Sequence, residues 1–262
     1  MKLEGKRVLL TGATGGLGEA MARQLAAAGA RLILTGRNQE KLQALKQQLA
    51  GGPHTTVVVD LHNAGQRQRL VDAVSETGID ILLNNAGINY LQLFADAPEE
   101  DVALQLEMNL LVPMQLTRAL LPVLQAQPEA LIINVGSILG SIGFAGSVAY
   151  SASKFGLRGF SEALRRELAD TTVGVLYFAP RATATPIHTD RMVQMNESLG
   201  TSVDKPDYVA QQLLRCIAGK RPHNHYLGWP EKLFVRLNGL LPTLVDKSLF
   251  KQLPVIKQFA GQ

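Results

Sequence analysis

Short apolar segments alternate along most of the chain with longer segments whose apolar residues recur every three or four positions. The short segments, such as "ALIINV", are almost continuously apolar, which is typical of strands covered by helices on both faces of a parallel sheet. Strands and helices that alternate at this spacing predict an α/β fold with a doubly wound parallel sheet. We expect strands at 7–12, 31–36, 55–61, 79–87, 130–137 and 173–180, and helices at 17–29, 39–50, 64–76, 99–125 and 147–168.

No feature of the chain divides it into separate units. No internal repeat, low-complexity run or Pro/Ser-rich linker interrupts its 262 residues, and α/β folds of this size are commonly single domains. We therefore expect residues 1–262 to form one domain that ends in an amphipathic helical extension, residues 229–262. The apolar positions of this extension are Leu233, Leu237, Leu240 and Leu241, followed beyond Pro242 by Leu244, Val245, Leu249 and Leu253.

The extension also carries most of the positive charge. Five basic and two acidic residues lie between Trp229 and Gln262, whereas the net charge of the whole chain is only +4. Three interpretations remain open: the extension covers the substrate pocket, contacts a partner subunit, or lies on an anionic membrane surface through residues 230–259. No dense cluster of Lys and Arg with interleaved aromatic residues occurs, so we expect no nucleic-acid partner.

Composition places the chain among ordinary globular proteins. Hydrophobic residues make up 46% and charged residues 18% of the sequence. Cys216 is the only cysteine, which excludes an intrachain disulfide and favours a reducing compartment. The start lacks a signal-peptide pattern, and no run reaches the roughly 20 apolar residues of a membrane-spanning helix. We expect a cytoplasmic protein, with a peripheral position at the inner membrane face as the second option.

The first strand leads directly into the glycine-rich segment "TGATGGLG", residues 11–18, which then opens a helix. Glycines 12, 16 and 18 permit a tight turn, close approach of the backbone to a pyrophosphate, and packing of the helix on the sheet. The N–H groups and the positive dipole at the helix start would face the anion. A tight turn can need glycine for geometry alone, but the strand–turn–helix context favours a dinucleotide site.

Three motifs in order carry a family resemblance. The T-G-x-x-x-G-x-G turn, "NNAG" at 84–87 and "YSASK" at 150–154 together resemble the short-chain dehydrogenase/reductase family, over residues 5 to about 185. The resemblance implies a Rossmann fold, a nicotinamide dinucleotide and a variable substrate lid at 186–205. It also implies that the cofactor is bound by Gly12, Thr14, Gly15, Gly16, Leu17, Gly18, Arg37, Asn38, Asp60, Leu61, Asn85, Ala86, Gly87, Tyr150, Lys154, Pro180 and Thr185.

The end of the second strand selects the dinucleotide. An acidic residue there would accept hydrogen bonds from the ribose 2′-hydroxyl of NAD, but Gly36 occupies its place and Arg37 follows. A guanidinium can hold a 2′-phosphate with a forked pair of hydrogen bonds, so we expect NADP(H). The second basic residue that the family often has before the second motif glycine is absent, because Gly15 stands there. The family's adenine contact matches Asp60, which could instead cap a helix.

Tyr150 and Lys154 stand one helical turn apart, about 6 Å along the axis and on one face. A cation at that distance favours the phenolate, so we expect Lys154 to lower the pKa of Tyr150. Such pairs also occur by chance, and the family resemblance is what assigns them a role. It implies a catalytic set of Asn109, Ser137, Tyr150 and Lys154, in which Tyr150 donates the proton and Asn109 holds a water beside the lysine.

Two other polar segments are considered for a role in binding. One departs from the family pattern, and the other lacks the ligands of a metal site. In "PRATATP" Thr185 keeps the threonine that contacts the nicotinamide carboxamide, but Arg181 replaces a glycine. We expect that arginine to point outward into solvent, with recognition of an anionic substrate as the alternative. His223 and His225 would share one face of a strand, but no third ligand follows at metal-site spacing, so no metal site is expected.

These features predict an NADPH-dependent reductase of a ketone or other carbonyl, reversible as an alcohol dehydrogenase, with a lipophilic or acyl-chain substrate. Two alternatives remain open. One is NAD(P)-dependent oxidation of a hydroxylated lipid or steroid at a membrane surface. The other is a non-catalytic nucleotide sensor that retains the fold. The family also implies a homodimer or homotetramer through the helices at 99–125 and 147–168.

Overall fold

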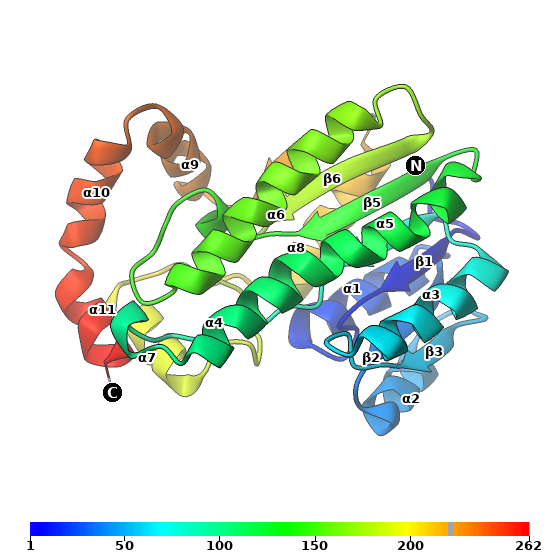
Figure 1. Ribbon diagram of the computed structural model, residues 1–262, viewed down its shortest axis with the longest axis horizontal. Coiled ribbons are helices and arrows are strands. Elements are labelled where there is room, and N and C mark those ends of the chain that lie inside the picture. Colours follow the sequence, from blue (N-terminus) through cyan, green and yellow to red (C-terminus); the bar gives the residue numbers. More distant parts are fainter. Residues whose placement is uncertain (220–222, 262) are drawn as a thin grey trace.

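A computed structural model describes residues 1–219 and 223–261. Its centre is one sheet of seven parallel strands in the order β3-β2-β1-β4-β5-β6-β7 (Figure 1). The strands are β1 (Arg7–Leu10), β2 (Arg31–Gly36), β3 (Thr55–Val58), β4 (Ile81–Asn84), β5 (Ala130–Val135), β6 (Val173–Ala179) and β7 (Asn224–Tyr226). The α-helices are α1 (Gly16–Ala27), α2 (Gln39–Gln48), α3 (Ala64–Thr77), α4 (Glu99–Leu106), α5 (Val112–Gln125), α6 (Val148–Glu167), α7 (Asp190–Ser198), α8 (Pro206–Ala218), α9 (Glu231–Leu240), α10 (Pro242–Phe250) and α11 (Leu253–Ala260).

Helices cover both faces of the sheet, as the continuously apolar strands predict. Alternate strand residues face opposite sides, so each strand contributes to two cores. On one face, Leu10 and Phe178 pack with residues of α1, α2 and α8. On the other, Leu9 and Val175 pack with residues of α3, α5 and α6. The doubly wound parallel sheet predicted from the sequence is therefore confirmed.

The expected helix over 99–125 is interrupted. Between α4 and α5, residues Glu107–Leu111 form a turn of π-helix centred on Asn109, which is fully buried. Such a turn widens the helix by one residue and is frequent at functional sites. The amphipathic pattern could not reveal it, because both flanking segments retain the helical period. The sequence prediction missed α8, and it considered a strand at β7 only when His223 and His225 were weighed as metal ligands.

The extension folds into three helices rather than the two segments expected. In Figure 1 they form one end of the molecule, near the carboxyl ends of the strands, with α11 beside α7. Val235 and Val245 pack on Ile138 and Ile142, which follow β5. Ile256 packs on Met195 of α7 within a second cluster. The inner face of the extension therefore covers segments that border the cavity described below.

No helix within the described residues is long and apolar enough to cross a membrane.

Candidate active site

A cavity of about 800 Å³ opens at the carboxyl ends of the central strands. Ligands of open α/β sheets bind at this edge, where successive strand–helix loops diverge. The loops after β1, β2, β4, β5 and β6 line the cavity, and the segment between β6 and α8 closes one side of it. The predicted cofactor residues that line it are Gly12, Thr14, Gly15, Gly16, Leu17, Gly18, Arg37, Asp60, Leu61, Asn85, Ala86, Gly87, Tyr150, Lys154, Pro180 and Thr185.

The glycine-rich turn has no room for a side chain at Gly12 or Gly18. Gly12 has a φ of +64°, and a Cβ there would lie 2.9 Å from Ala86 Cα. A Cβ on Gly18 would lie 2.1 Å from the Gly12 carbonyl oxygen. The first turn of α1 follows directly, and no side chain caps it. Its free N–H groups and positive dipole end therefore suit the pyrophosphate of a dinucleotide, as the sequence predicts.

The loop after β4 is held against the glycine-rich turn. The Thr11 hydroxyl accepts hydrogen bonds from the backbone N–H groups of Asn85, at 2.9 Å, and Ala86, at 3.0 Å. The Asn85 side-chain amide donates to the carbonyl oxygens of Thr11, at 3.0 Å, and Gly12, at 3.2 Å. The "NNAG" segment thus fixes two walls of the cavity relative to each other.

At the end of β2, Arg37 is exposed and borders the cavity. Within the described ranges no carboxylate pairs with its guanidinium. Asn38 does not line the cavity; its side chain accepts a 2.8 Å hydrogen bond from Lys41 N and caps α2. Asp60 does border the cavity, and its carboxylate accepts a 3.0 Å bond from His62 N. The helix-cap role considered for Asp60 belongs to Asn63, which caps α3.

Ser137, Tyr150 and Lys154 come together on one wall of the cavity. Ser137 follows the last residues of β5, and its side chain lies close enough to the Tyr150 phenol to lower the pKa of that phenol; its Oγ accepts a 3.1 Å hydrogen bond from Leu139 N. Lys154 lies one turn along α6, with its ammonium 5.6 Å from the centre of the Tyr150 ring. The lysine is buried and donates a 2.9 Å hydrogen bond to the Val135 carbonyl oxygen. The spacing within "YSASK" therefore places the phenol and the amine together, and the segment after β5 brings the Ser137 hydroxyl to the same wall.

The electrostatics of this wall depend mainly on burial. Burial raises the pKa of Tyr150 to about 12, and the neighbouring Ser137 side chain offsets only part of that rise. Burial also lowers the pKa of Lys154 to about 8. In the protein alone, therefore, burial outweighs any lowering of the Tyr150 pKa, because it removes the phenolate from water. The lowering expected from Lys154 together with an oxidised nicotinamide stays a prediction.

Asn109 lies behind this wall rather than in the cavity. Its Oδ1 accepts from Ile88 N and its Nδ2 donates to Ile88 O, both at 2.8 Å. The same Nδ2 donates to Ser153 Oγ at 3.1 Å, and that hydroxyl donates to the Tyr150 carbonyl oxygen at 2.7 Å. The π-turn thus presents an amide that ties the loop after β4 to the helix carrying Tyr150 and Lys154.

The far end of the cavity is formed by the expected lid, whose methionines suit an apolar ligand or ordinary packing, and by residues that the sequence prediction did not assign. The lid is expected at 186–205, and in the structure it contains α7, whose Met192 and Met195 face the cavity. Phe144 and Leu139 approach from the segment between β5 and α6. No sequence motif identifies Phe144 and Leu139 as cavity residues, because they come near the lid only in the folded chain. The lining of this end also includes Asn89, Tyr90, His188, Asn196 and Thr201.

Arg181 does not point into solvent as expected. Its guanidinium donates to both carboxylate oxygens of Asp204, at 2.8 and 3.0 Å, and to Glu231 at 3.3 Å. Only 19% of its side chain is exposed. These bonds join the end of β6, the end of the lid and the first turn of α9. The residue that replaces the family glycine therefore fastens the lid and the extension together at the border of the cavity.

The two histidines considered for metal binding pack as aromatic rings. His225 stacks on Phe178 with ring centres 6.0 Å apart, and His223 meets His225 edge-on. In the described part of the chain, no group of three or more His, Cys, Asp or Glu side chains could hold a metal ion.

Comparisons with known proteins bear on this geometry. The family model of the short chain dehydrogenases matches residues 6–196. The chain belongs to the short-chain dehydrogenase/reductase family. This short-chain dehydrogenase/reductase is 34% identical over 257 aligned residues to the ketoacyl reductase HetN of a Nostoc species, covering 94% of this chain and 88% of the relative. It is 35% identical to the 3-oxoacyl-[acyl-carrier-protein] reductase FabG of Vibrio cholerae, covering 77% of this chain and 82% of that protein.

Solved structures of the short-chain dehydrogenase/reductase family have the same fold. A short-chain dehydrogenase from Burkholderia cenocepacia in complex with NADP covers 95% of this chain and 99% of its own, with 25% identity and a TM-score of 0.80. A family member from Burkholderia phymatum in complex with NAD superposes with a TM-score of 0.83 at 23% identity, covering 93% of this chain and 96% of its own. This chain is accordingly an oxidoreductase whose cavity fits a nicotinamide dinucleotide.

Proposed function

We propose that this protein is an NADPH-dependent carbonyl reductase, reversible as an alcohol dehydrogenase, that acts on a lipophilic or acyl-chain ketone. The observation that carries the proposal is that Ser137 and Tyr150 line the same wall of the cavity close to each other, with Lys154 one turn away on that wall. The names of the ketoacyl reductase and the 3-oxoacyl reductase among the relatives support an acyl-chain carbonyl. The methionines and phenylalanine at the far end of the cavity suit an apolar chain.

Each residue of this wall has a separate task in the proposal. The bound nicotinamide supplies hydride to the carbonyl carbon. Ser137 donates a hydrogen bond to the carbonyl oxygen as negative charge develops there. Tyr150 transfers its phenolic proton to that oxygen. Lys154 holds the cofactor's ribose hydroxyls and stabilises the phenolate that remains. Asn109 keeps the backbone near Tyr150 in place through Ser153.

The pH dependence of reduction is expected to follow Lys154 rather than Tyr150. The pKa of Tyr150 is about 12, so the phenol keeps its proton across the neutral and mildly alkaline range. The pKa of Lys154 is about 8, so its ammonium is present below that pH and is lost above it. Initial rates at saturating ketone and limiting NADPH should be level below about pH 8 and fall by roughly tenfold per pH unit above it. A rate that stays level throughout would contradict the role given to Lys154.

We also propose NADP(H) as the preferred cofactor, supported by the exposed and unpaired guanidinium of Arg37 beside the cavity. A 2′-phosphate at that point would meet a forked cation that forms no ion pair within the described residues. The corresponding test is described in the Discussion. Activity measurements distinguish the two open alternatives from this proposal. A lipid or steroid dehydrogenase would oxidise a hydroxylated lipid with NAD(P), whereas a nucleotide sensor would bind NADPH without turnover of any carbonyl.

For quaternary structure we propose a homodimer, with a homotetramer as the larger assembly. Apolar side chains are exposed on the outer faces of α4 to α6, the helices through which the family resemblance implies pairing. They include Leu106 and Phe155, which are 37% and 41% exposed. Residues of this size are seldom left in water in such number on one face. Sedimentation velocity should give at least twice the 28.3 kDa of one chain, and a monomer would contradict the proposal.

We propose further that the outer face of α9 and α10 contacts an anionic membrane surface. Its exposed apolar side chains include Leu240, at 80%, and Phe250, at 66%. Three exposed cations, Arg236, Lys247 and Lys251, lie among them, against the single exposed carboxylate of Asp246. Apolar residues that insert and cations that meet headgroups are the two components of interfacial binding, each cation contributing about 1 kcal/mol near an anionic surface.

Membrane contact can be measured by co-sedimentation with vesicles of phosphatidylserine and phosphatidylcholine in equal parts. We expect Leu240→Glu to lower the bound fraction roughly tenfold, because it removes one inserted side chain and adds a repelled charge. The matched control is Val58→Glu on β3, an exposed apolar residue at the opposite edge of the sheet. Equal binding of both variants, or no binding of the unaltered protein, would refute the proposal. If Leu240→Glu instead changed only the sedimentation mass, the face would bind a second copy of the chain.

A further inference from the structure

Tyr177, on β6, is a fully buried tyrosine that has no role in the site described so far. It lies on the side of the strand that faces α6, where it packs with Leu157. A phenol with no access to water requires hydrogen-bond partners inside the protein. The partners of Tyr177 are backbone atoms of two residues of the proposed catalytic set.

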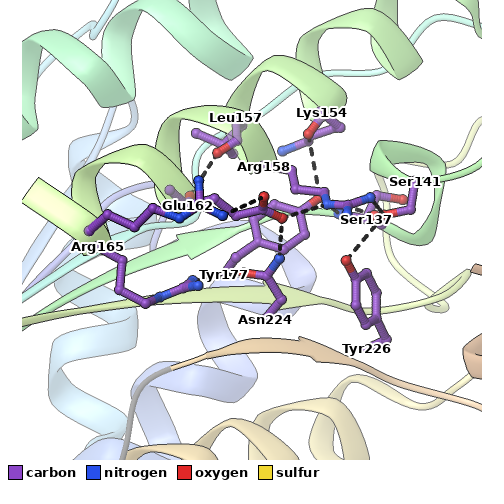
Figure 2. A network of polar contacts seen from close by, with 12 residues as sticks. Ser137, Ser141, Lys154, Leu157, Arg158, Glu162, Arg165, Tyr177, Asn224 and Tyr226 are labelled. Carbon is purple, nitrogen blue, oxygen red and sulfur yellow. Dashed lines mark hydrogen bonds and ion pairs between the residues drawn. The ribbon is translucent and has the colours of Figure 1, made fainter. Parts of the chain in front are cut away.

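The Tyr177 hydroxyl lies between the backbones of two residues of the proposed catalytic set. It can donate to the carbonyl oxygen of Ser137, at 3.2 Å, or to that of Lys154, at 3.4 Å, and it accepts from Ser137 N at 3.4 Å (Figure 2). Ser137 follows β5, whereas Lys154 lies on α6. One hydroxyl group therefore bridges the two segments whose separation sets the distance from the serine to the tyrosine and lysine.

Two glycines make the space that this hydroxyl occupies. A Cβ on Gly136 would lie 2.2 Å from ring carbons of Tyr177, and a Cβ on Gly140 would lie 2.2 Å from its hydroxyl oxygen. Gly136 and Gly140 flank Ser137 in sequence, before and after it. The chain around the serine is thus shaped to the tyrosine, and any larger residue at either position would displace one of the two.

We propose that Tyr177 is a positioning residue that sets the geometry of Ser137 and Lys154 for carbonyl reduction. The inference rests on the proposed function, since it assigns Tyr177 a task in the same reaction. Burial raises the pKa of the Tyr177 phenol above its ordinary range, so the hydroxyl keeps its proton and remains both a donor and an acceptor. Because both contacts are to backbone atoms, the effect of Tyr177 passes through the placement of the two residues and not through contact with substrate.

A second layer of contacts keeps α6 against the edge of the sheet, and it supplies a control. Arg158 donates to Glu162 at 2.8 Å and to Ser141 Oγ at 3.0 Å, and Ser141 Oγ lies 3.4 Å from the Tyr226 hydroxyl (Figure 2). The rings of Tyr226 and Tyr177 meet edge-on with centres 6.4 Å apart. Tyr226 therefore belongs to the same network, but within the described residues its hydroxyl hydrogen-bonds Ser141 and neither Ser137 nor Lys154.

The test compares Tyr177→Phe with Tyr226→Phe in the full chain. Each variant loses one phenolic hydroxyl from the same pair of rings, so a general loss of core polarity would affect both alike. Steady-state reduction of a medium-chain ketone by NADPH gives kcat and KM, fluorescence titration gives the NADPH dissociation constant, and thermal melting gives stability. We expect Tyr177→Phe to lower kcat by about tenfold, the equivalent of one net hydrogen bond, with less than a twofold change in ketone KM. Tyr226→Phe should stay within twofold of the unaltered protein in both.

The outcomes separate this inference from the proposed function. If the unaltered protein reduces the ketone and Tyr177→Phe is equally active, positioning by Tyr177 is wrong and the proposed function stands. A fall in activity that matches the fall in folded protein, or an equal fall in Tyr226→Phe, also overturns it. If the unaltered protein reduces no carbonyl, the proposed function fails. The NADPH titration then decides: a severalfold weaker affinity in Tyr177→Phe alone supports displacement of Lys154, and an unchanged affinity overturns it.

Discussion

Replacing Tyr150 by phenylalanine is expected to lower kcat for carbonyl reduction by roughly a thousandfold, which is within the range that general acid catalysis contributes. The substitution keeps the ring beside Ser137 and removes only the proton that the substrate oxygen receives. Because Lys154 and the glycine-rich turn remain, NADPH should bind with nearly unchanged affinity. Stopped-flow measurement of NADPH consumption, together with fluorescence titration of NADPH, tests both parts.

Tyr90→Phe is the matched control for this prediction. Tyr90 also lines the cavity, and no hydrogen bond of its hydroxyl is among those found in the described residues. The same loss of a phenolic oxygen there should change kcat by no more than a few-fold. Equal carbonyl reduction by Tyr150→Phe and the unaltered protein would contradict the role of Tyr150 as proton donor. NADPH binding without turnover of any carbonyl in either protein would favour the nucleotide-sensor alternative.

Arg37→Asp should reverse the choice of dinucleotide. In the proposed complex Arg37 holds the 2′-phosphate of NADPH, and charge-assisted hydrogen bonds of this kind contribute roughly 1.5–3 kcal/mol. Their loss, with repulsion from the new carboxylate, should lower the ratio of kcat/KM for NADPH to that for NADH by roughly a hundredfold. The aspartate can also accept from the ribose 2′-hydroxyl, so activity with NADH should be retained.

Arg31→Asp controls for the change of charge, since Arg31 is exposed at the opposite end of the same strand, far from the cavity edge. It should leave the cofactor ratio unaltered. A cofactor ratio that is the same in Arg37→Asp and in the unaltered protein would show that Arg37 does not contact the 2′-phosphate, and the NADP(H) assignment would be withdrawn.

The fold and the cofactor end could be predicted well because they depend on local sequence. A strand buried on both faces must be continuously apolar, and a turn this tight must have glycine where the backbone passes close to its neighbours, as at Gly12 and Gly18. Tyr150 and Lys154 share a helix face through their spacing alone. Asn38 shows the limit of this reasoning: it follows Arg37 in sequence, but its side chain turns to cap α2.

The pKa values of the protein alone could not be predicted, for a related reason. Sequence spacing gives the distance from Lys154 to Tyr150 but says nothing of how much water reaches them. Burial moves the pKa of both groups toward their neutral forms, and that effect is larger than the attraction expected from proximity. Arg181 is similar: its surroundings, Asp204 and Glu231, lie 23 and 50 residues away in the chain.

The sequence by itself determined the parallel sheet, the glycine-rich turn and the register of Tyr150 with Lys154, since each follows from periodicity or spacing within one segment. Only the tertiary structure decided the apolar end of the cavity, the fastening of the lid by Arg181 and the contact of Tyr177 with Ser137 and Lys154. These depend on which distant segments meet and on how far water is excluded between them. The spacing of residues along one strand or helix determines neither which distant segments meet nor how far water is excluded between them.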